Sequence, residues 1–355
     1  MTTQFNNGAS GAAMFNNGSG TPQGRTKVHG FPLPPEGRQY RPTYSRGRYA
    51  LPDPETGKPS RYTRVTTGAH TLDATEGLDI WKTGNVVLGL KDHPELLDDI
   101  DMYADPADMR RQARRVANKA QDYAGANEAA ELGTAIHAWT EAVERDGLAP
   151  EDVPDQFQPY VNAYLDTLAE WGVTTVPGMV ERIVYHPASG WVGTLDRIYQ
   201  MADGARVIGD IKTSKTLQHG WLGFSVQFAT YADAAYMLSL DGSKWEPMPV
   251  VSSDYAVVAH VPSNQPGRCS LVTFDLAAGR EYLGLAVAVR CARLEAGRRV
   301  QGKWELPKPQ EDLEPAVFAC RSMEELAALW ESHPGGWTPD LVERALAHVA
   351  SLGGK

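Results

Sequence analysis

The sequence is poor in several features that define whole classes of protein. It contains three cysteines, Cys269, Cys291 and Cys320, which are too few and too widely spaced for a disulfide scaffold or a four-thiolate cluster. It has no uninterrupted apolar run near the ~20 residues that a membrane span requires. Its N-terminus lacks the basic start and apolar stretch of a signal peptide. A protein of the reducing cytoplasm that does not enter a membrane is therefore expected.

An excess of positive charge is also missing. The chain has 34 Lys and Arg residues against 44 Asp and Glu residues, which gives a net charge of −10. Proteins that coat nucleic acid by bulk charge are basic, so this class is excluded, although a local basic groove is not. With 355 residues and 42% hydrophobic content, the chain is long and apolar enough to bury a substantial core.

The charge is divided unevenly along the chain. Residues 1–64 carry nine basic and three acidic residues, a net charge of +6, which leaves −16 for the remainder. Within this segment Phe5-Asn-Asn-Gly8 recurs as Phe15-Asn-Asn-Gly18 among Gly, Asn and Ser. Such a composition cannot bury enough apolar surface to fold, so residues 1–24 are predicted to be a disordered low-complexity tail. The repeat is either part of that tail or a short motif that binds a partner protein.

Residues 25–64 are rich in Pro, Arg and Tyr, and we expect an extended basic arm. Arginines alternate there with Tyr40, Tyr44 and Tyr49. Guanidinium groups that contact phosphates, beside rings that stack on bases, suit single-stranded nucleic acid. A basic linker without a ligand is the alternative interpretation.

The body of the chain has the pattern of a mixed α/β fold. Hydrophobic periodicity predicts helices, then a meander of antiparallel strands, then a helix, two strands and more helices. The first predicted helix begins at Asp105. The next four are predicted at Glu128–Arg145, Asp155–Trp171, Trp221–Leu240 and Leu276–Arg298, and two short C-terminal helices follow. The predicted strands are Met179–Tyr185, Trp191–Tyr199, Arg206–Thr213, Tyr255–Val261 and Ser270–Phe274. We place one domain at 65–310 and a helical extension at 311–355.

The first of these helices carries the densest positive patch of the body. Asp105 has the character of an N-cap and Pro106 that of a first helical residue. The stripe consists of Arg110, Arg111, Arg114, Arg115 and Lys119. It is either a solvated helix face or a surface that contacts nucleic-acid phosphates.

Three acidic residues and a lysine are predicted to converge on the strand meander. Asp210 and Lys212 share one face of their strand, whereas Ile211 points to the other. A three-residue loop centred on Asp203 would place Asp196 opposite Asp210, and a turn at 187–190 would place Glu181 opposite Asp196. Carboxylates this close repel one another unless a divalent cation lies between them. The geometry favours a metal site over a structural ion pair in which Lys212 only neutralises an aspartate.

Two helices carry further polar residues at a spacing of four. Gly133 and His137 share one helix face, and the missing side chain at Gly133 lets another element or a ligand approach closely. Gln227 and Tyr231 share a face of the helix that follows the meander.

In this order the residues form a recognisable set. Gly133-x-x-x-His137, Gly193-x-x-Asp196, Asp210-x-Lys212 and Gln227-x-x-x-Tyr231 resemble the motifs of the RecB-like nucleases of the PD-(D/E)XK superfamily. The resemblance covers about residues 130–240 and implies a restriction-endonuclease-like core. It also implies a stand-alone nuclease of the kind encoded by phages, which would act in the cytoplasm of the bacterial host.

The resemblance implies a role for each motif residue. His137, Asp196, Asp210 and the backbone carbonyl of Ile211 would bind Mg²⁺ or Mn²⁺. Lys212 would orient or deprotonate the attacking water, and Glu181 would support the metal's waters. Gln227 and Tyr231 would hold the DNA backbone or Lys212. A hard cation with oxygen ligands, beside a lysine, is also what phosphodiester hydrolysis requires chemically.

Two departures from the family's sequence patterns limit which cofactors and which fused domains are expected. Members with an iron–sulfur cluster have one of four cysteines upstream of the nuclease core, but no cysteine precedes Cys269 here, so no cluster is expected. The ATP-binding pattern of the helicase-fused enzymes is missing, because Thr56-Gly57-Lys58 lacks the upstream glycine and is followed by Pro59.

The sequence therefore predicts a metal-dependent DNA exonuclease of recombination, repair or replication. A site- or structure-specific endonuclease on the same fold and a non-catalytic DNA-binding scaffold are the alternatives. Because the body is acidic, contact with DNA phosphates must come from the basic helix stripe, from Lys212 and Lys215, and, unless it is only a linker, from the N-terminal arm.

Overall fold

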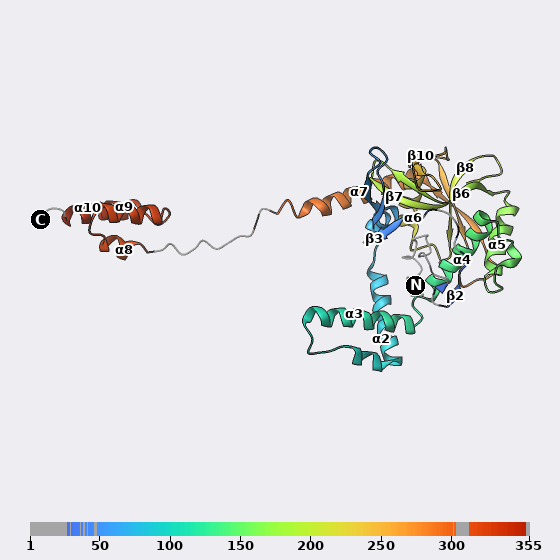
Figure 1. Ribbon diagram of the computed structural model, residues 1–355, viewed down its shortest axis with the longest axis horizontal. Coiled ribbons are helices and arrows are strands. Elements are labelled where there is room, and N and C mark those ends of the chain that lie inside the picture. Colours follow the sequence, from blue (N-terminus) through green and yellow to red (C-terminus); the bar gives the residue numbers. More distant parts are fainter. Residues whose placement is uncertain are drawn as a thin grey trace, which may run out of the picture. The chain divides into compact units, whose positions relative to one another are not determined.

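The computed structural model describes residues 27–28, 30–35, 37, 40, 42–45, 48–300, 302 and 312–352. The chain forms two compact units that divide between Glu295 and Ala296 (Figure 1). The boundary predicted between residues 310 and 311 therefore shifts toward the N-terminus. The predicted tail at 1–24 and its repeat lie outside the described residues.

The first unit is built on a mixed sheet, which has ten strands in the described part of the chain. Its larger half consists of β6 (Thr174–His186), β7 (Trp191–Gln200), β8 (Arg206–Lys212), β9 (Tyr236–Leu238), β10 (Trp245–Pro247), β11 (Tyr255–His260) and β12 (Ser270–Asp275). The strands β6, β7 and β8 form the predicted antiparallel meander. β11 runs parallel to β8, and its other neighbour β12 is antiparallel. The mixed α/β architecture with helical flanks is confirmed.

The segment predicted to be a basic arm contributes to this sheet. The segment adds β3 (Thr43–Ser45), β4 (Arg48–Pro52) and β5 (Pro59–Arg64) to it, whereas β1 (Lys27–Val28) and β2 (Phe31–Pro32) form a separate two-stranded sheet. β3, β4 and β5 are joined in antiparallel pairs, and β5 pairs in parallel with β7. Tyr49, Leu51 and Tyr62 are buried in a cluster with residues of β6 and β7. The boundary predicted at residue 64 thus does not separate an arm from a domain, because these side chains complete the core.

Helices cover both faces of the sheet (Figure 1). One face packs on α4 (Glu128–Asp146) and α5 (Gln158–Glu170). The other face packs on α1 (Val65–Ala69), α6 (Trp221–Ala232) and α7 (Leu276–Ala296). Short 3₁₀ turns lie at His70–Leu72 and Pro150–Asp152. Ile211 packs with the α4 and α5 layer, as its alternation with Asp210 and Lys212 predicts.

A helical hairpin carries the basic stripe. It is formed by α2 (Glu76–Asp92), the 3₁₀ segment η3 (Pro94–Asp99) and α3 (Pro106–Tyr123), which share a small apolar cluster of their own. Asp105 caps α3 as predicted, because its side chain accepts a hydrogen bond from the amide of Ala107 at 2.8 Å. The stripe therefore lies on a helix that packs mainly against its hairpin partner.

Both predicted hairpin registers are confirmed. Arg197 opposes Gly209, which is the register that brings Asp196 level with Asp210. The amide of Met201 donates to the carbonyl of Ala205 at 2.8 Å, which gives the three-residue loop on which that register depends. In the first hairpin His186 opposes Trp191 across the turn at 187–190.

The predicted helix over 221–240 is wrong in its second half. α6 ends at Ala232, and residues 236–238 form β9 on the free edge of β6. The run from Ala234 to Leu238 is apolar in a way that fits either a helix or a strand. The backbone groups on the edge of β6 decide the outcome, since the amide of Ala235 donates to the carbonyl of Tyr185 at 3.0 Å.

The second unit consists of three helices in the described range 312–352, where two were predicted. They are α8 (Glu314–Ala319), α9 (Met323–Ser332) and α10 (Pro339–Leu352), and they enclose one apolar cluster. In the described parts of both units, none of the helices combines the length and the apolar character needed to cross a bilayer.

Candidate functional site

The site lies where β7 changes its partner along one edge. Trp191 and Val192 pair with β5, whereas pairing with β8 begins at Arg197. Buried peptide groups in the stretch between these pairings need other partners. The Tyr231 hydroxyl donates to the Thr194 carbonyl at 2.8 Å, and the Asp196 carboxylate accepts from the Ile211 amide at 3.1 Å. The gap between the two ladders is thus where polar side chains enter the sheet.

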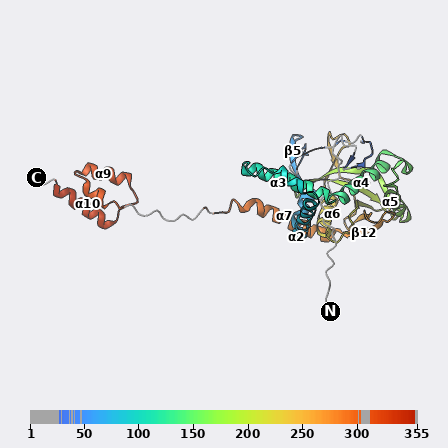
Figure 2. The same ribbon diagram turned by 90° about the horizontal axis from the view of Figure 1, so that it is seen from below.

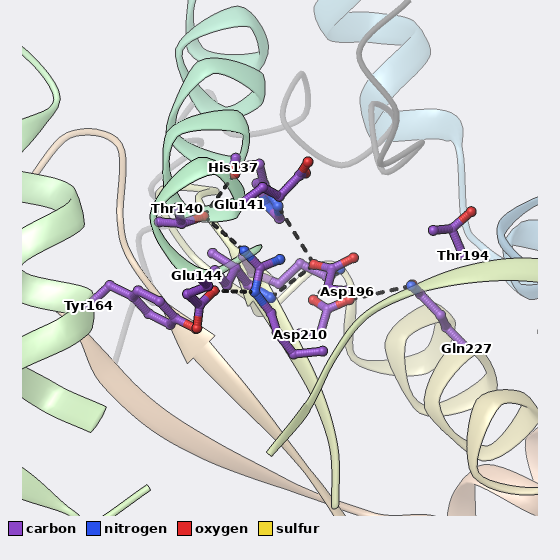
Figure 3. A network of polar contacts seen from close by, with 12 residues as sticks. His137, Thr140, Glu141, Glu144, Tyr164, Thr194, Asp196, Asp210 and Gln227 are labelled. Atoms are coloured by element: carbon purple, nitrogen blue, oxygen red, sulfur yellow. Dashed lines mark hydrogen bonds and ion pairs between the residues drawn. The ribbon is translucent and has the colours of Figure 1, made fainter. Parts of the chain in front are cut away.

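Three of the predicted metal-binding groups come together there. Figure 3 shows His137 on α4 and Asp196 on β7 pointing toward one another, with 3.6 Å between Nδ1 and the nearer carboxylate oxygen. Asp210 lies beside Asp196 on the neighbouring strand (Figure 3). Asp196 and Asp210 are almost completely buried, and 18% of the His137 side chain is exposed. The backbone of Ile211 lies close enough to His137 to affect its pKa.

Lys212 reaches the same cluster from the end of β8. Its Nζ lies 2.5 Å from Oδ2 of Asp210, and the side chain is 4% exposed. Phe224 and Phe228 of α6 lie beneath the ammonium, at 4.8 and 5.8 Å from Nζ to the ring centroids. Aromatic faces attract a cation, and a buried ammonium is stable only with such partners. These contacts fix the lysine side chain next to the two aspartates.

Gln227 and Tyr231 contact each other and the strands that carry the acidic pair. Nε2 of Gln227 donates to Asp210 at 3.5 Å and lies 3.4 Å from the Tyr231 hydroxyl. Tyr231 is 1% exposed, and its hydroxyl is committed to Thr194. A side chain buried to this extent cannot reach a DNA backbone as it lies. The pair instead holds β7 and β8 against α6.

Two motif glycines allow these close approaches. A methyl group at Gly133 would collide with the Thr213 hydroxyl, so the missing side chain lets the end of β8 approach α4 beside His137. A methyl group at Gly193 would lie 2.6 Å from the Tyr231 ring and 2.8 Å from Val65. Both glycines therefore determine how closely elements pack around the acidic pair.

Burial controls the electrostatics of the cluster. It lowers the pKa of His137 to about 4, although the negative charge of Asp196 opposes this shift. Burial, together with the charge of Asp196, raises the pKa of Asp210 to about 7. Two carboxylates in one desolvated site disfavour each other's ionisation, and a cation between them would relieve the repulsion. The imidazole is neutral at pH 7, which is the form that binds metals.

The donor set fits a hard divalent cation. Asp196, Asp210 and the Ile211 carbonyl offer oxygen ligands, and Nδ1 of His137 is buried with no hydrogen-bond partner in the described part of the chain. As the side chains lie, no group of three His, Cys, Asp or Glu residues among those described is close enough together to hold an ion. In this arrangement the positive charge that lies next to the Asp210 carboxylate is the ammonium of Lys212.

Glu181 lies at the predicted register position but has an unusual backbone. The neighbouring pairs Val180–Arg197 and Arg182–Leu195 place it level with Asp196. Its φ of +53° is in the left-handed region, which a residue with a side chain rarely adopts. Its charge raises the pKa of Arg145, so the carboxylate lies near that guanidinium. Glu181 therefore lies level with Asp196 and near the guanidinium of Arg145.

Sequence reasoning missed a buried polar network behind the site (Figure 3). Arg197 is completely buried; its Nε donates to Glu144 at 2.8 Å, and its Nη2 donates to Thr140 at 3.1 Å. Glu144 also accepts from the Tyr164 hydroxyl at 2.8 Å. Because Arg197 follows Asp196 directly, this network fixes the strand that carries the acidic residue. The sequence signal for this network is Glu144, which lies seven residues after His137 and therefore on the same helix face.

The predicted DNA-binding residues lie apart from the acidic cluster along the chain. Arg110, Arg114 and Arg115 are exposed on α3, whereas Lys119 pairs with Asp99 at 2.7 Å and Arg111 pairs with Asp108. Lys215 is exposed in the loop that follows β8. Three arginines of the stripe are thus available to a ligand without breaking an ion pair recorded for the described residues.

No protein-family model and no curated protein matches this sequence.

Proposed function

We propose that this protein is a divalent-metal-dependent DNA exonuclease of the RecB-like, PD-(D/E)XK type. The observation that supports it best is the convergence of Asp196, Asp210 and Lys212 with His137 at the gap between two strand ladders. A structural ion pair needs one acid and one base. This cluster has a second buried acid and a neutral imidazole, which stability alone does not require.

His137, Asp196, Asp210 and the carbonyl of Ile211 would hold Mg²⁺ or Mn²⁺. When bound, such an ion lowers the pKa of a water ligand and neutralises charge on the phosphate. Lys212, kept in place by Asp210 and by the rings of α6, presents its ammonium where charge develops on the phosphate. Gln227 positions Asp210 through its hydrogen bond.

DNA would be held outside the acidic cluster. Arg110, Arg114 and Arg115 are exposed on α3, and Lys215 follows the catalytic strand. Phosphate contacts of this kind give affinity without reading the base sequence, as an enzyme that degrades DNA from its ends requires.

The test uses the full chain with end-labelled linear duplex and covalently closed circular DNA, in Mg²⁺, Mn²⁺ or EDTA. Degradation of the linear substrate alone, abolished by EDTA, is the expected result. The variants Asp210→Asn and Lys212→Met should both lose activity by at least about 10³-fold while keeping their far-UV circular dichroism. The matched controls are Asp166→Asn on α5 and Lys244→Met, which directly precedes β10; both positions are exposed. They should cleave like the wild type.

Other outcomes would reject the proposal in part or whole. Cleavage of closed circles would identify an endonuclease. DNA binding without cleavage in any metal would identify a non-catalytic scaffold. Wild-type activity in either site variant would remove the acidic cluster from the mechanism.

A further inference from the structure

The C-terminal unit has an apolar groove between α9 and α10, which lie side by side (Figure 2). Its volume is about 160 Å³. The residues that line it are almost all apolar: Met323, Leu326, Ala327, Trp330, Trp337, Val342, Ala345 and Leu346. A cavity of about 150 Å³ lined by apolar side chains accepts a molecule of benzene, so this groove has room for one large apolar side chain.

The groove leaves apolar surface and one polar group without a partner. Met323, Trp330 and Leu346 are 55%, 48% and 48% exposed, although they line the same hollow. The Trp337 indole N–H is buried with no acceptor in the described part of the chain. Contiguous exposed apolar side chains on a small unit typically mark an interaction site, and a buried indole normally has a hydrogen-bond partner.

Acidic side chains border the groove on both helices. On α9, Glu324 and Glu331 lie three and four residues from the lining residue Ala327, and on α10 Glu343 lies three residues from Leu346, so each adjoins a lining residue on the helix surface. All three are exposed, and no ion pair is recorded for them within the described residues. The range 312–352 carries seven acidic and two basic residues, a net charge of −5. Such a rim repels nucleic acid and attracts a cationic partner.

From these features we propose that the α9–α10 groove binds an amphipathic helix of a partner protein. The helix would insert one large apolar side chain between Trp330 and Leu346 and place Lys or Arg side chains against the acidic rim. A helix lying in a groove between two helices is a common mode of peptide recognition, and it needs only such an anchor and flanking charges. The anchor determines affinity, whereas the rim selects basic over acidic segments.

This role goes beyond cleavage of DNA and does not depend on it. The groove is formed entirely by residues of the second unit, and the acidic cluster by residues of the first. A partner bound at the groove would be tethered to the nuclease unit by the chain itself, which raises its effective concentration at the same DNA.

The experiment measures fluorescence anisotropy of a labelled helical peptide made of Leu and Lys with one central Phe. The full-length protein is titrated into it, and a peptide with Glu in place of Lys serves as the ligand control. The variants are Leu346→Lys in the groove and Glu331→Lys on the rim. Both positions are exposed, so folding should be retained. The matched protein control is Leu294→Lys on α7, at a side chain that is 76% exposed.

We expect the basic peptide to bind the wild type and Leu294→Lys equally. Each of the other two variants should weaken binding by at least about tenfold, and added salt should weaken it further. Equal binding to Leu346→Lys, or equal binding of the acidic peptide, would overturn the proposal. The proposal would also be overturned if Leu346→Lys lost duplex DNA binding but kept peptide binding. All three variants should degrade linear DNA at the wild-type rate, so failure of the nuclease proposal would be seen separately.

Discussion

Replacing Gly193 with alanine would insert one methyl group between β7 and the helices that cover it. Gly193 has no left-handed backbone, so an alanine fits the local conformation and only the space around it matters. The new Cβ would lie 2.6 Å from Cε1 of Tyr231, 2.9 Å from its hydroxyl and 2.8 Å from Cγ2 of Val65. Both neighbours are 1% exposed, and the Tyr231 hydroxyl is anchored to Thr194. Neither side chain can rotate away, so α6 and α1 must move.

The size of the effect follows from these distances. Carbon atoms in good contact are about 3.5–4.0 Å apart, so the Tyr231 ring must retreat by about 1 Å. Overpacking of this kind costs about 1–3 kcal/mol, and three short contacts with two immobile side chains place Gly193→Ala in the upper half of that range. Gln227, on the same helix, would move away from Asp210. A displacement of about 1 Å in a catalytic group lowers activity by about 100-fold.

The assay combines amide hydrogen exchange with the turnover of linear DNA. Amide hydrogen exchange of β7 reports the free energy of opening of the first unit alone, and single-turnover degradation of linear DNA reports the site. Gly84→Ala is the matched control, because that glycine lies inside α2 with nothing within 4 Å of the added methyl group. It should stabilise α2 by up to about 1 kcal/mol and leave activity unchanged. Wild-type exchange and activity in Gly193→Ala would refute the reasoning.

Three further changes test other parts of the molecule. Arg197→Met should lower the free energy of unfolding by about 3 kcal/mol, measured by urea denaturation, because Glu144 remains buried without its main counter-charge; a loss below about 1 kcal/mol would contradict this. Replacing both Arg110 and Arg114 with Gln should reduce the slope of log affinity against log salt by about 2, without changing metal binding; an unchanged slope would remove α3 from the DNA contact. Deleting residues 1–60 should unfold part of the first unit, as seen in exchange of β7, because it removes β3 and β4; a stable, active truncation would show that these strands are dispensable.

The sequence predicts the register of the acidic residues better than it predicts the rest of the sheet, and the reason is the range of the interactions. The three-residue loop centred on Asp203 and the turn at 187–190 are local, so they determine which residues of β6, β7 and β8 are opposed. The alternation of Asp210, Ile211 and Lys212 is also local. Asp196 and Asp210 could therefore be paired correctly before any tertiary contact was known.

The remaining features depend on partners distant in the chain. β5 pairs with β7 more than a hundred residues away, and nothing in its Pro- and Arg-rich sequence indicates this. Gln227 and Tyr231 were correctly placed on one helix face, but their burial against β7 depends on how α6 packs. Nothing local to β7 indicates the role of Arg197, because its partner, Glu144, lies on another element.

The arrangement of charge explains how an acidic protein could attract DNA phosphates to this site. Around the gap in β7, the carboxylates of Asp196, Asp210 and Glu144 are formally opposed by Lys212 and Arg197, which leaves a net charge of −1 with His137 neutral. A phosphate is repelled by such a cluster, all the more because burial weakens screening by solvent. A divalent cation held by the proposed ligands would change the local charge to +1. On the proposed function, the same carboxylates that make the chain acidic would therefore make productive binding of DNA at this site depend on the metal, while the arginines of α3 supply affinity with or without it.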